Sequence, residues 1–230
     1  MQGSSSFLKE LMKQRLISKM NNKFFELIRE KVKGYMNCSG HDFDHVERVY
    51  NLAIKIAKKE NADLDIIKTA ALLHDTAREM EDKKEVSCHA EEGAKIAREI
   101  LEKTDFPKEK IENVVYCIKV HRYSKGLKAE TKEAMIIQDA DRLDALGAVC
   151  IARMFAYGGQ KKRIMHSKAI KPKETYTGES ETVVNHFYEK ILKIKPELFN
   201  TKFARKLAKR RYKFTEKFVK EFLLEWEGKA

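Results

Sequence analysis

The chain has 230 residues, of which 43% are hydrophobic, and a formal net charge of +12. It is long enough to bury a substantial core as one large domain or two small ones. Its apolar runs are far shorter than the roughly 18 residues that span a bilayer, and no signal-peptide pattern opens it, so we expect a cytoplasmic protein without a membrane segment. The four cysteines are widely spaced, which excludes a CxxC pair and a dense disulfide framework.

Helical periodicity dominates the sequence. Only 10 Gly and 3 Pro interrupt the chain, and apolar residues recur at a spacing of 3.6 rather than two residues. These features predict an all-α fold. Helices are expected, in chain order, at about 7–32 (as one or two helices), 45–57, 64–74, 89–101, 107–121, 132–157, 181–194 and 201–226.

The segment 158–180 lacks this periodicity. Glycines and a proline gather there among lysines and threonines, which is typical of a loop or lid. We therefore expect a single domain made of four successive parts: an N-terminal extension at 1–20, a helical core at 21–157, the loop or lid at 158–180, and C-terminal helices at 181–230 that pack on the core.

The positive charge favours anionic partners such as nucleotides or phosphates. Many basic residues fall in the last third of the chain, between Lys202 and Lys213. A solvated helix face explains this run about as well as a nucleic-acid surface does. We expect a small phosphorylated substrate and keep nucleic-acid binding as an alternative.

Two adjacent residues, His74 and Asp75, end an apolar helical segment and carry ligand-type side chains. Candidate partners lie far away in the sequence: His45, other histidines, and the acidic cluster at 138–144. Imidazole mixed with carboxylate suits a divalent ion such as Mn²⁺, Mg²⁺, Fe²⁺ or Co²⁺, whereas structural zinc sites more often use thiolates. The sequence thus predicts a metal centre.

The sequence resembles the HD-domain superfamily of metal-dependent phosphohydrolases, and more closely its small bacterial and archaeal branch of predicted nucleotide hydrolases. Five separated segments carry the resemblance in order: Gly40–Val49, Leu72–Asp75, His89–Ala94, Gln138–Gly147 and Asn185–Lys190. The resemblance implies an HD-domain helical bundle with a C-terminal helical extension. It also implies one divalent ion (Mn, Mg, Co, Fe or Ni) and allows a second.

By this resemblance, His45, His74, Asp75 and an aspartate of the 138–144 cluster hold the metal. Asp141 is the preferred aspartate, because Asp139 points about 200° away around the helix and is the weaker alternative. Asp144 lies three residues after Asp141 on the same face, where it can orient a ligand imidazole or Arg142.

The resemblance further implies metal-assisted phosphoester hydrolysis, with Asp75 and an acid nearby as catalytic residues. Some relatives carry acids three and four residues after the His-Asp pair. Here those positions hold Arg78 and Glu79, so Glu79 alone is the proton-transfer candidate.

Several basic and imidazole side chains are candidates for substrate contact. Arg48, one turn after His45, either binds phosphate or pairs with a carboxylate of the site. His89 and His121 resemble histidines that some relatives use for a second metal and others for phosphate contact. Arg142 and Lys119 are weaker basic candidates.

Three reactions fit these residues: pyrophosphate release from a triphosphate, loss of phosphate from a monophosphate, and phosphodiester cleavage. Two other classes compete with them. An HD-type di-iron oxygenase is one, and a non-catalytic basic protein that binds nucleic acid is the other. A homodimer is compatible with all of these readings.

Overall fold

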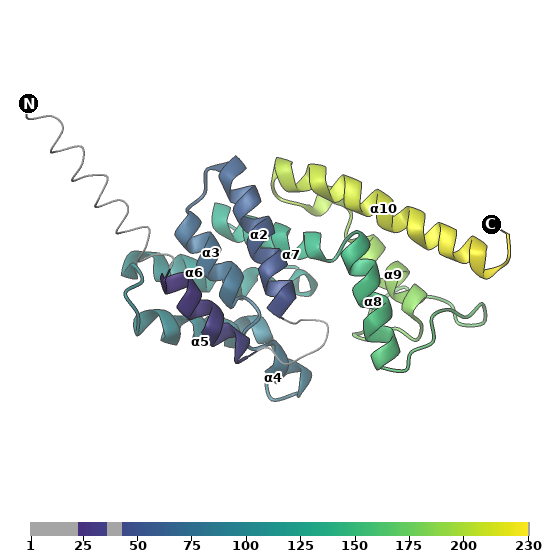
Figure 1. Cartoon of the computed structure of the whole chain (residues 1–230), viewed down its shortest axis with the longest axis horizontal. Coiled ribbons are helices and arrows are strands. Elements are labelled where there is room, and N and C mark those ends of the chain that lie inside the picture. The colour runs from purple at the N-terminus through teal and green to yellow at the C-terminus, as the bar shows by residue number, and fades with distance from the viewer. Residues whose placement is uncertain (1–22, 36–42, 230) are drawn as a thin grey trace, which may run out of the picture.

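The computed structural model describes residues 23–35 and 43–229 (Figure 1). Within these ranges the regular structure is helical without a strand, and one isolated parallel bridge joins Ile164 and Thr182. The predicted all-α class is confirmed. Three predicted features lie outside the described residues: the extension at 1–20, the start of the first predicted helix, and motif residues 40–42.

Nine α-helices with assigned bounds follow a helical stretch at 23–33 in the described chain. They are α2 (Phe43–Glu60), α3 (Leu64–Leu73), α4 (Arg78–Asp82), α5 (His89–Glu102), α6 (Lys108–Val120), α7 (Lys132–Asp144), α8 (Ala148–Gln160), α9 (Val183–Glu189) and α10 (Lys202–Trp226). Three short 3-10 helices are η1 (Tyr123–Lys125), η2 (Ile191–Lys193) and η3 (Pro196–Leu198). None of the helices among the described residues is long and apolar enough to cross a bilayer.

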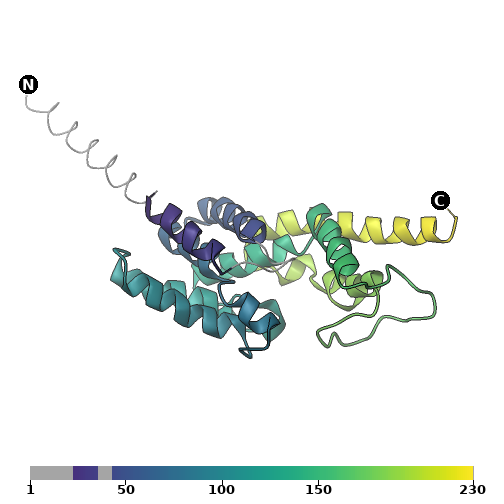
Figure 2. The ribbon, with the colours of Figure 1, turned by 60° about the horizontal axis from the view of Figure 1, so that its bottom comes forward.

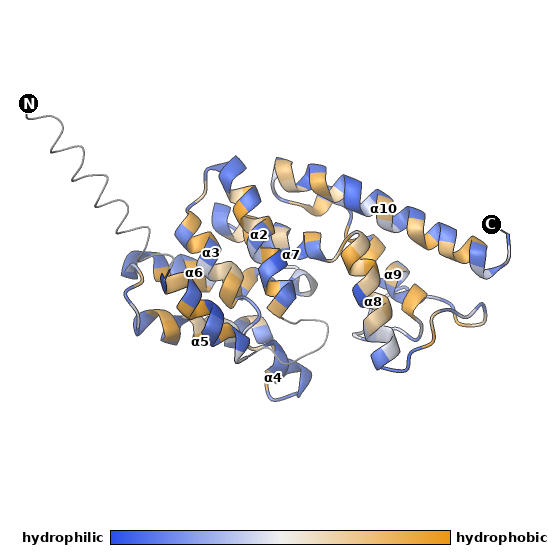
Figure 3. Cartoon of the chain, viewed as in Figure 1, coloured by the Kyte–Doolittle hydropathy of each residue, from blue (hydrophilic) through white to orange (hydrophobic). Residues whose placement is uncertain are grey.

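Helix α3 lies at the centre of the bundle. It packs against α2, α6 and α7, while α5 packs on α6 and α2 packs on α7 (Figure 1). Being covered on several sides, α3 is apolar nearly all round, and its Leu72 and Leu73 are fully buried (Figure 3). The side chains that follow the end of α3 therefore lie inside the protein.

The C-terminal helices form a second layer beside this bundle. The 25-residue α10 contacts α2, α7 and α8, and so runs from the bundle along the C-terminal part of the chain (Figures 1 and 2). Aromatic rings fill the space between α8, α9 and α10, where the Phe155 ring centroid lies 6.2 Å from that of Phe187 and 5.9 Å from that of Phe218. These aromatic residues pack as core.

The single helix predicted at 132–157 is wrong, because the structure divides it into α7 and α8. Gly147 separates them with φ +91°, a conformation that disfavours other residues. Its N–H donates to Thr215 Oγ1 (2.9 Å), and a Cβ at this position would lie 3.2 Å from Arg211 Cγ. Apolar spacing continues through the break, which is why periodicity did not reveal it.

The long connection begins at residue 161, since α8 extends to Gln160. It is fastened to α9 by buried polar groups: the Ser180 hydroxyl donates to Glu189, and Ser180 Oγ lies 3.1 Å from His186 Nδ1. The Val183 N–H also bonds to the Ile164 carbonyl (3.0 Å). Movement of this segment as a lid stays a prediction.

Asp139 supports the N-terminus of α10. Its carboxylate accepts bonds from the N–H groups of Asn200 (2.8 Å) and Thr201 (2.8 Å) and from the Thr201 hydroxyl (2.9 Å). Thr201 in turn caps α10 by accepting from the Ala204 N–H. This carboxylate is therefore committed to joining α7 and α10.

We expect Asp139→Ala to lower the free energy of unfolding by about 2–4 kcal/mol, because it leaves buried donors without an acceptor. Urea denaturation followed by circular dichroism measures the loss. A change below about 0.5 kcal/mol would contradict the supporting role, given the size of ordinary surface effects.

Burial lowers the pKa of His186 from 6.5 to about 4, and the positive charges of Lys190 and Arg163 act in the same direction. Between these two values the unfolded chain binds a proton that the folded protein does not, so stability falls as the pH decreases. We expect His186 to contribute a loss of about 2 kcal/mol between pH 7 and 5. Urea denaturation at both pH values should show that His186→Gln loses less free energy of unfolding between pH 7 and 5 than the wild-type protein does. An equal loss in the two proteins would contradict the contribution of His186.

Candidate metal centre

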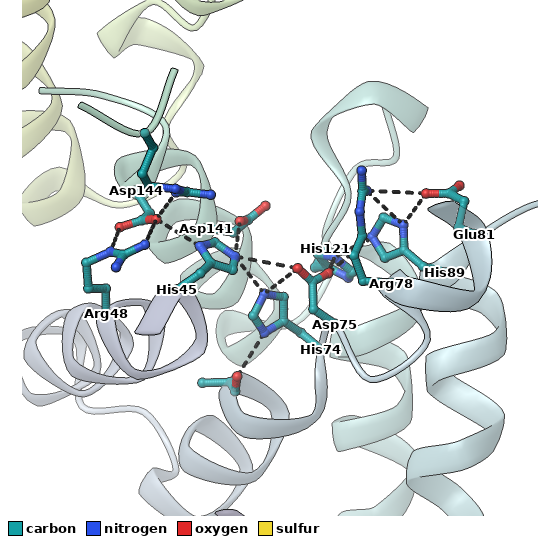
Figure 4. Close-up of polar contacts among 12 residues, drawn as sticks. His45, Arg48, His74, Asp75, Arg78, Glu81, His89, His121, Asp141 and Asp144 are labelled. Carbon is teal, nitrogen blue, oxygen red and sulfur yellow. Dashed lines mark hydrogen bonds and ion pairs between the residues drawn. The ribbon is translucent and has the colours of Figure 1, made fainter. Parts of the chain in front are cut away.

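Four of the predicted ligands come together from three elements of the bundle. His45 lies in the first turn of α2, His74 caps the C-terminal end of α3 with Asp75 next to it, and Asp141 lies on α7. The Nε2 atoms of His45 and His74 are 3.3 Å apart, and each lies 3.6 Å from Asp75 Oδ2 (Figure 4). Asp141 Oδ1 lies 3.5 Å from His45 Nε2.

A second pair of histidines faces the other oxygen of Asp75. His89 begins α5 and His121 caps the end of α6, and their Nε2 atoms are 3.3 Å apart. Asp75 Oδ1 lies 3.3 Å from His89 Nε2 and 3.6 Å from His121 Nε2. The Asp75 carboxylate thus lies between two histidine pairs (Figure 4).

All four imidazoles are held through Nδ1. The acceptors are Asp144 Oδ2 for His45 (2.8 Å), the Ala71 carbonyl for His74 (2.8 Å), Glu81 Oε2 for His89 (2.7 Å) and the Ile118 carbonyl for His121 (2.6 Å). An acceptor at Nδ1 fixes the proton there and leaves a lone pair on Nε2. Lone pairs that face each other at 3.3 Å in a buried site repel unless a cation lies between them.

The spacing of these atoms fits a divalent metal. Imidazole nitrogens at about 2.1 Å from an ion lie roughly 3.0–3.4 Å apart in tetrahedral or octahedral geometry. The Nε2 atoms of His45 and His74 meet this requirement at 3.3 Å. Among the described residues, two groups of three potential ligands have their ligand atoms within 4.8 Å of one another: His45, His74 and Asp141, and His74, Asp75 and His121. The mixed nitrogen and oxygen donors suit the divalent ions expected from the sequence.

The protonation states also fit a metal. Burial lowers the pKa of His74 to about 4. Burial alone would raise the pKa of Asp75, but the imidazoles of His74, His121, His89 and His45 hold it well below its usual range. At neutral pH His74 therefore offers a neutral imidazole and Asp75 an ionised carboxylate, which are the forms that bind metals. Burial alone would lower the pKa of His121, but the Asp75 carboxylate raises it, so an ion bound by His121 would displace a proton from it.

Asp144 supports His45 from the side opposite Asp75. It also accepts bonds from Arg48, whose Nε lies 2.8 Å from Oδ1, and from Arg153. Burial alone would raise the pKa of Asp144, but these partners and His45 lower it below its usual range. Of the two roles expected for Arg48, the structure contains the pairing with a carboxylate, and Asp144 contacts an imidazole rather than Arg142.

Three weaker candidates point elsewhere. Asp139 is occupied by the N-terminus of α10, as described above. Arg142 donates to the Leu198 carbonyl (2.8 Å) and to Gln138 Oε1 (3.0 Å), so its guanidinium ties α7 to the segment before α10. Lys119 is exposed and lines a surface groove with Lys95 and Arg98. These contacts leave Asp139, Arg142 and Lys119 outside the metal centre.

Glu81 was missed in the sequence. It lies on the short α4, accepts from His89, and pairs with Arg78 (3.3 Å) and Arg122. A five-residue helix carries too little periodicity to be predicted. The available signal was an acid six residues after Asp75, at a position that no motif marked.

Glu79 and Lys190 are not among the candidate metal ligands and have other surroundings. Glu79 is in the first turn of α4 and pairs with Lys83 (2.6 Å), so its proton-transfer role stays a prediction. Lys190 ends the last matching segment but was not singled out. Burial lowers its pKa, the charges of Arg78 and Arg122 lower it further, and Asp141 opposes them, which indicates a cation close to the metal ligands.

Comparison with known proteins identifies the family. The HD domain model matches residues 42–146. The uncharacterized protein YpgQ of Bacillus subtilis is 35% identical over 206 residues, which cover 85% of this chain and 90% of YpgQ. This chain belongs to the HD superfamily.

Solved structures agree with this assignment. An HD-superfamily hydrolase from Bacillus thuringiensis matches with a TM-score of 0.71 and 36% identity over 90% of this chain and 98% of its own. YpgQ from Bacillus subtilis in complex with ADP matches with a TM-score of 0.65 and 31% identity over 88% of this chain and 94% of its own. The resemblance stated from sequence motifs is confirmed, and the chain is an HD-superfamily hydrolase.

We expect Asp75→Ala to abolish Mn²⁺ binding and Asp141→Ala to weaken it by about tenfold or more, since each removes a candidate ligand. Isothermal titration calorimetry measures both. Asp139→Ala is the matched control, two residues away on the same helix, and should retain the wild-type affinity. Equal losses in Asp139→Ala and Asp141→Ala would overturn the choice of Asp141.

Proposed function

We propose that this protein is a metal-dependent phosphohydrolase that acts on a nucleotide or a similar small phosphorylated metabolite. The observation that carries the proposal is the convergence of four imidazole Nε2 atoms on the two oxygens of Asp75. A bound divalent ion supplies a Lewis acid that polarises a phosphoryl oxygen and lowers the pKa of water. The complex of the related YpgQ with ADP supports a nucleotide as substrate.

Two adjacent ion positions fit the donors. His45, His74 and Asp141 would hold one ion, and His89 and His121 would hold the other, with one oxygen of Asp75 facing each. This arrangement favours a metal role for His89 and His121 over phosphate contact. We expect Mn²⁺ titration to give two ions per wild-type chain and one per chain of His121→Ala.

Positive side chains next to the centre would recognise the phosphate groups. The charges of Arg78 and Arg122 lower the pKa of Lys190, which burial already lowers. Arg78 pairs with Glu81 and Asp82, and Arg122 pairs with Glu81. Lys190 is half-buried, and a charge there interacts more strongly with a phosphate than it does in water. These residues would orient the phosphate and stabilise charge that develops on its oxygens.

Glu79 would accept the proton of the attacking water. In this step the water oxygen forms a bond to phosphorus, the bond from phosphorus to the leaving group breaks, and the leaving oxygen takes the electron pair. Glu79 follows Asp75 by four residues and lies in the first turn of α4. This assignment makes it a general base, while Asp75 positions the metal.

A release screen tests the reaction. Phosphate and pyrophosphate would be measured with nucleoside mono-, di- and triphosphates in the presence of Mn²⁺, Mg²⁺, Co²⁺, Fe²⁺ or Ni²⁺. We expect metal-dependent release by the wild-type protein and background release by Asp75→Ala. Oxygen consumption with bound iron would instead favour the di-iron oxygenase, and metal-independent nucleic-acid binding with a steep salt dependence would favour the non-catalytic alternative.

The general base is tested separately. We expect Glu79→Gln to lower kcat by about 10²–10⁴-fold with Mn²⁺ affinity retained, because it loses only the proton acceptor. Lys83→Gln, which removes the ion-pair partner of Glu79, is the matched control and should change kcat by less than about fivefold. Wild-type kcat in Glu79→Gln would refute the assignment.

A further inference from the structure

A surface groove lies beside Asp144, on the side of His45 opposite the metal centre. Its volume is about 640 Å³, and its walls come from α2, the turn between α7 and α8, the start of α8, and α10. Small-molecule sites in proteins have volumes of about 300–1,000 Å³. We call it the basic groove, and its main lining residues are Arg48, Lys55, Val149, Arg210, Arg211 and Phe214.

Positive charge dominates this groove. Four of its lining side chains are basic, and the only carboxylate among them is Asp144, which is buried and already bonded to His45, Arg48 and Arg153. Burial lowers the pKa of Arg211; the charge of Asp144 opposes this, and the nearby charges of Arg210 and Arg48 lower the pKa further. Like charges held this close favour an anion between them.

The backbone adds to this preference. Ala148 and Val149 line the groove and form the first turn of α8, whose cap residue Gly147 provides no side-chain acceptor. The first N–H groups of a helix have no partner within the helix and carry a partial positive charge. The Arg211 side chain passes close to Gly147, so the break between α7 and α8 brings this helix start and the arginines of α10 together.

One part of the groove is apolar and open to solvent. Val149 is 47% exposed and Phe214 is 52% exposed. An exposed ring beside several cations suits a ligand with a flat apolar group attached to phosphates. Two arginines of the basic run on α10, Arg210 and Arg211, line this groove, so the run is more than a helix face that contacts only solvent.

The groove is separate from the metal centre. Asp144 bonds to His45 Nδ1, whereas Asp75, Asp141 and His74 lie at His45 Nε2 (Figure 4). The imidazole ring therefore stands between the groove wall and the metal ligands. A ligand in the groove can be studied with the metal centre disabled.

We propose that the basic groove is a second ligand site that binds a nucleoside polyphosphate or a similar phosphorylated molecule with a flat apolar group. Its phosphates lie among Lys55, Arg210, Arg211 and the first turn of α8. Its apolar group packs against Phe214 and Val149. The site goes beyond the proposed hydrolysis and does not depend on it.

Calorimetric titration of ATP into the Asp75→Ala protein in EDTA tests the site, with the wild-type protein in EDTA as a second background. We expect ATP to bind in both. Charge reversal at two exposed groove residues, Lys55→Glu with Arg210→Glu, should weaken binding by about tenfold or more. The control is Lys217→Glu with Lys220→Glu, which changes the net charge by the same amount on an exposed part of α10 outside the groove. This control should weaken ATP binding by less than about twofold.

Phe214→Ala tests the contact with the apolar group of the ligand separately from the contacts with its phosphates. Because Phe214 is exposed, its truncation should leave the fold intact, which circular dichroism checks. We expect it to weaken ATP binding by about fivefold or more while leaving tripolyphosphate binding unchanged. An unchanged ATP affinity would overturn the placement of the apolar group.

Three other results would overturn the site itself. They are absence of ATP binding in both backgrounds, equal losses in the groove and control variants, and a homodimer that Phe214→Ala dissociates and that binds no ATP. In the last case the groove is covered by a second copy of the chain. None of these results depends on hydrolytic activity, so the proposed function stands or falls separately.

Discussion

The hydrogen bonds at the Nδ1 atoms of four histidines are the constraint on which the site depends. Each bond fixes one tautomer and turns Nε2 toward Asp75. Two acceptors are carbonyls of the helices that carry the histidines, and two are carboxylates from other parts of the chain. The bundle therefore sets both the positions of the imidazoles and the direction of their lone pairs.

This arrangement is costly without a cation. Four buried imidazoles and a buried carboxylate face one another at 3.3–3.6 Å, where lone pairs repel and water has little access. Bound divalent ions, one facing each oxygen of Asp75, would satisfy these atoms. Metal binding is thus expected to stabilise the folded protein as well as to equip it for hydrolysis.

The break at Gly147 links the metal centre to the rest of the molecule. In one continuous helix, Arg153 would point about 180° away from Asp144, since nine residues correspond to two and a half turns. The break brings Arg153 back to Asp144, and α10 packs over the same turn through Thr215 and Arg211. One turn thereby supports His45 through Asp144 and forms a wall of the basic groove.

The sequence by itself determined the helical class, most of the helices and the family, because apolar periodicity and short motifs are local signals. It also predicted His45, His74, Asp75 and Asp141 as metal ligands, and these four residues lie together in the structure. Tertiary structure decided which carboxylates support the histidines. The sequence placed Asp144 on the face of Asp141 but left open whether it contacts an imidazole or Arg142; in the structure Asp144 bonds to His45, and Asp139 holds the N-terminus of α10. Glu81 reaches His89 from the short helix α4, which no periodic pattern marked. Such contacts join residues far apart in the chain, and only packing brings them together.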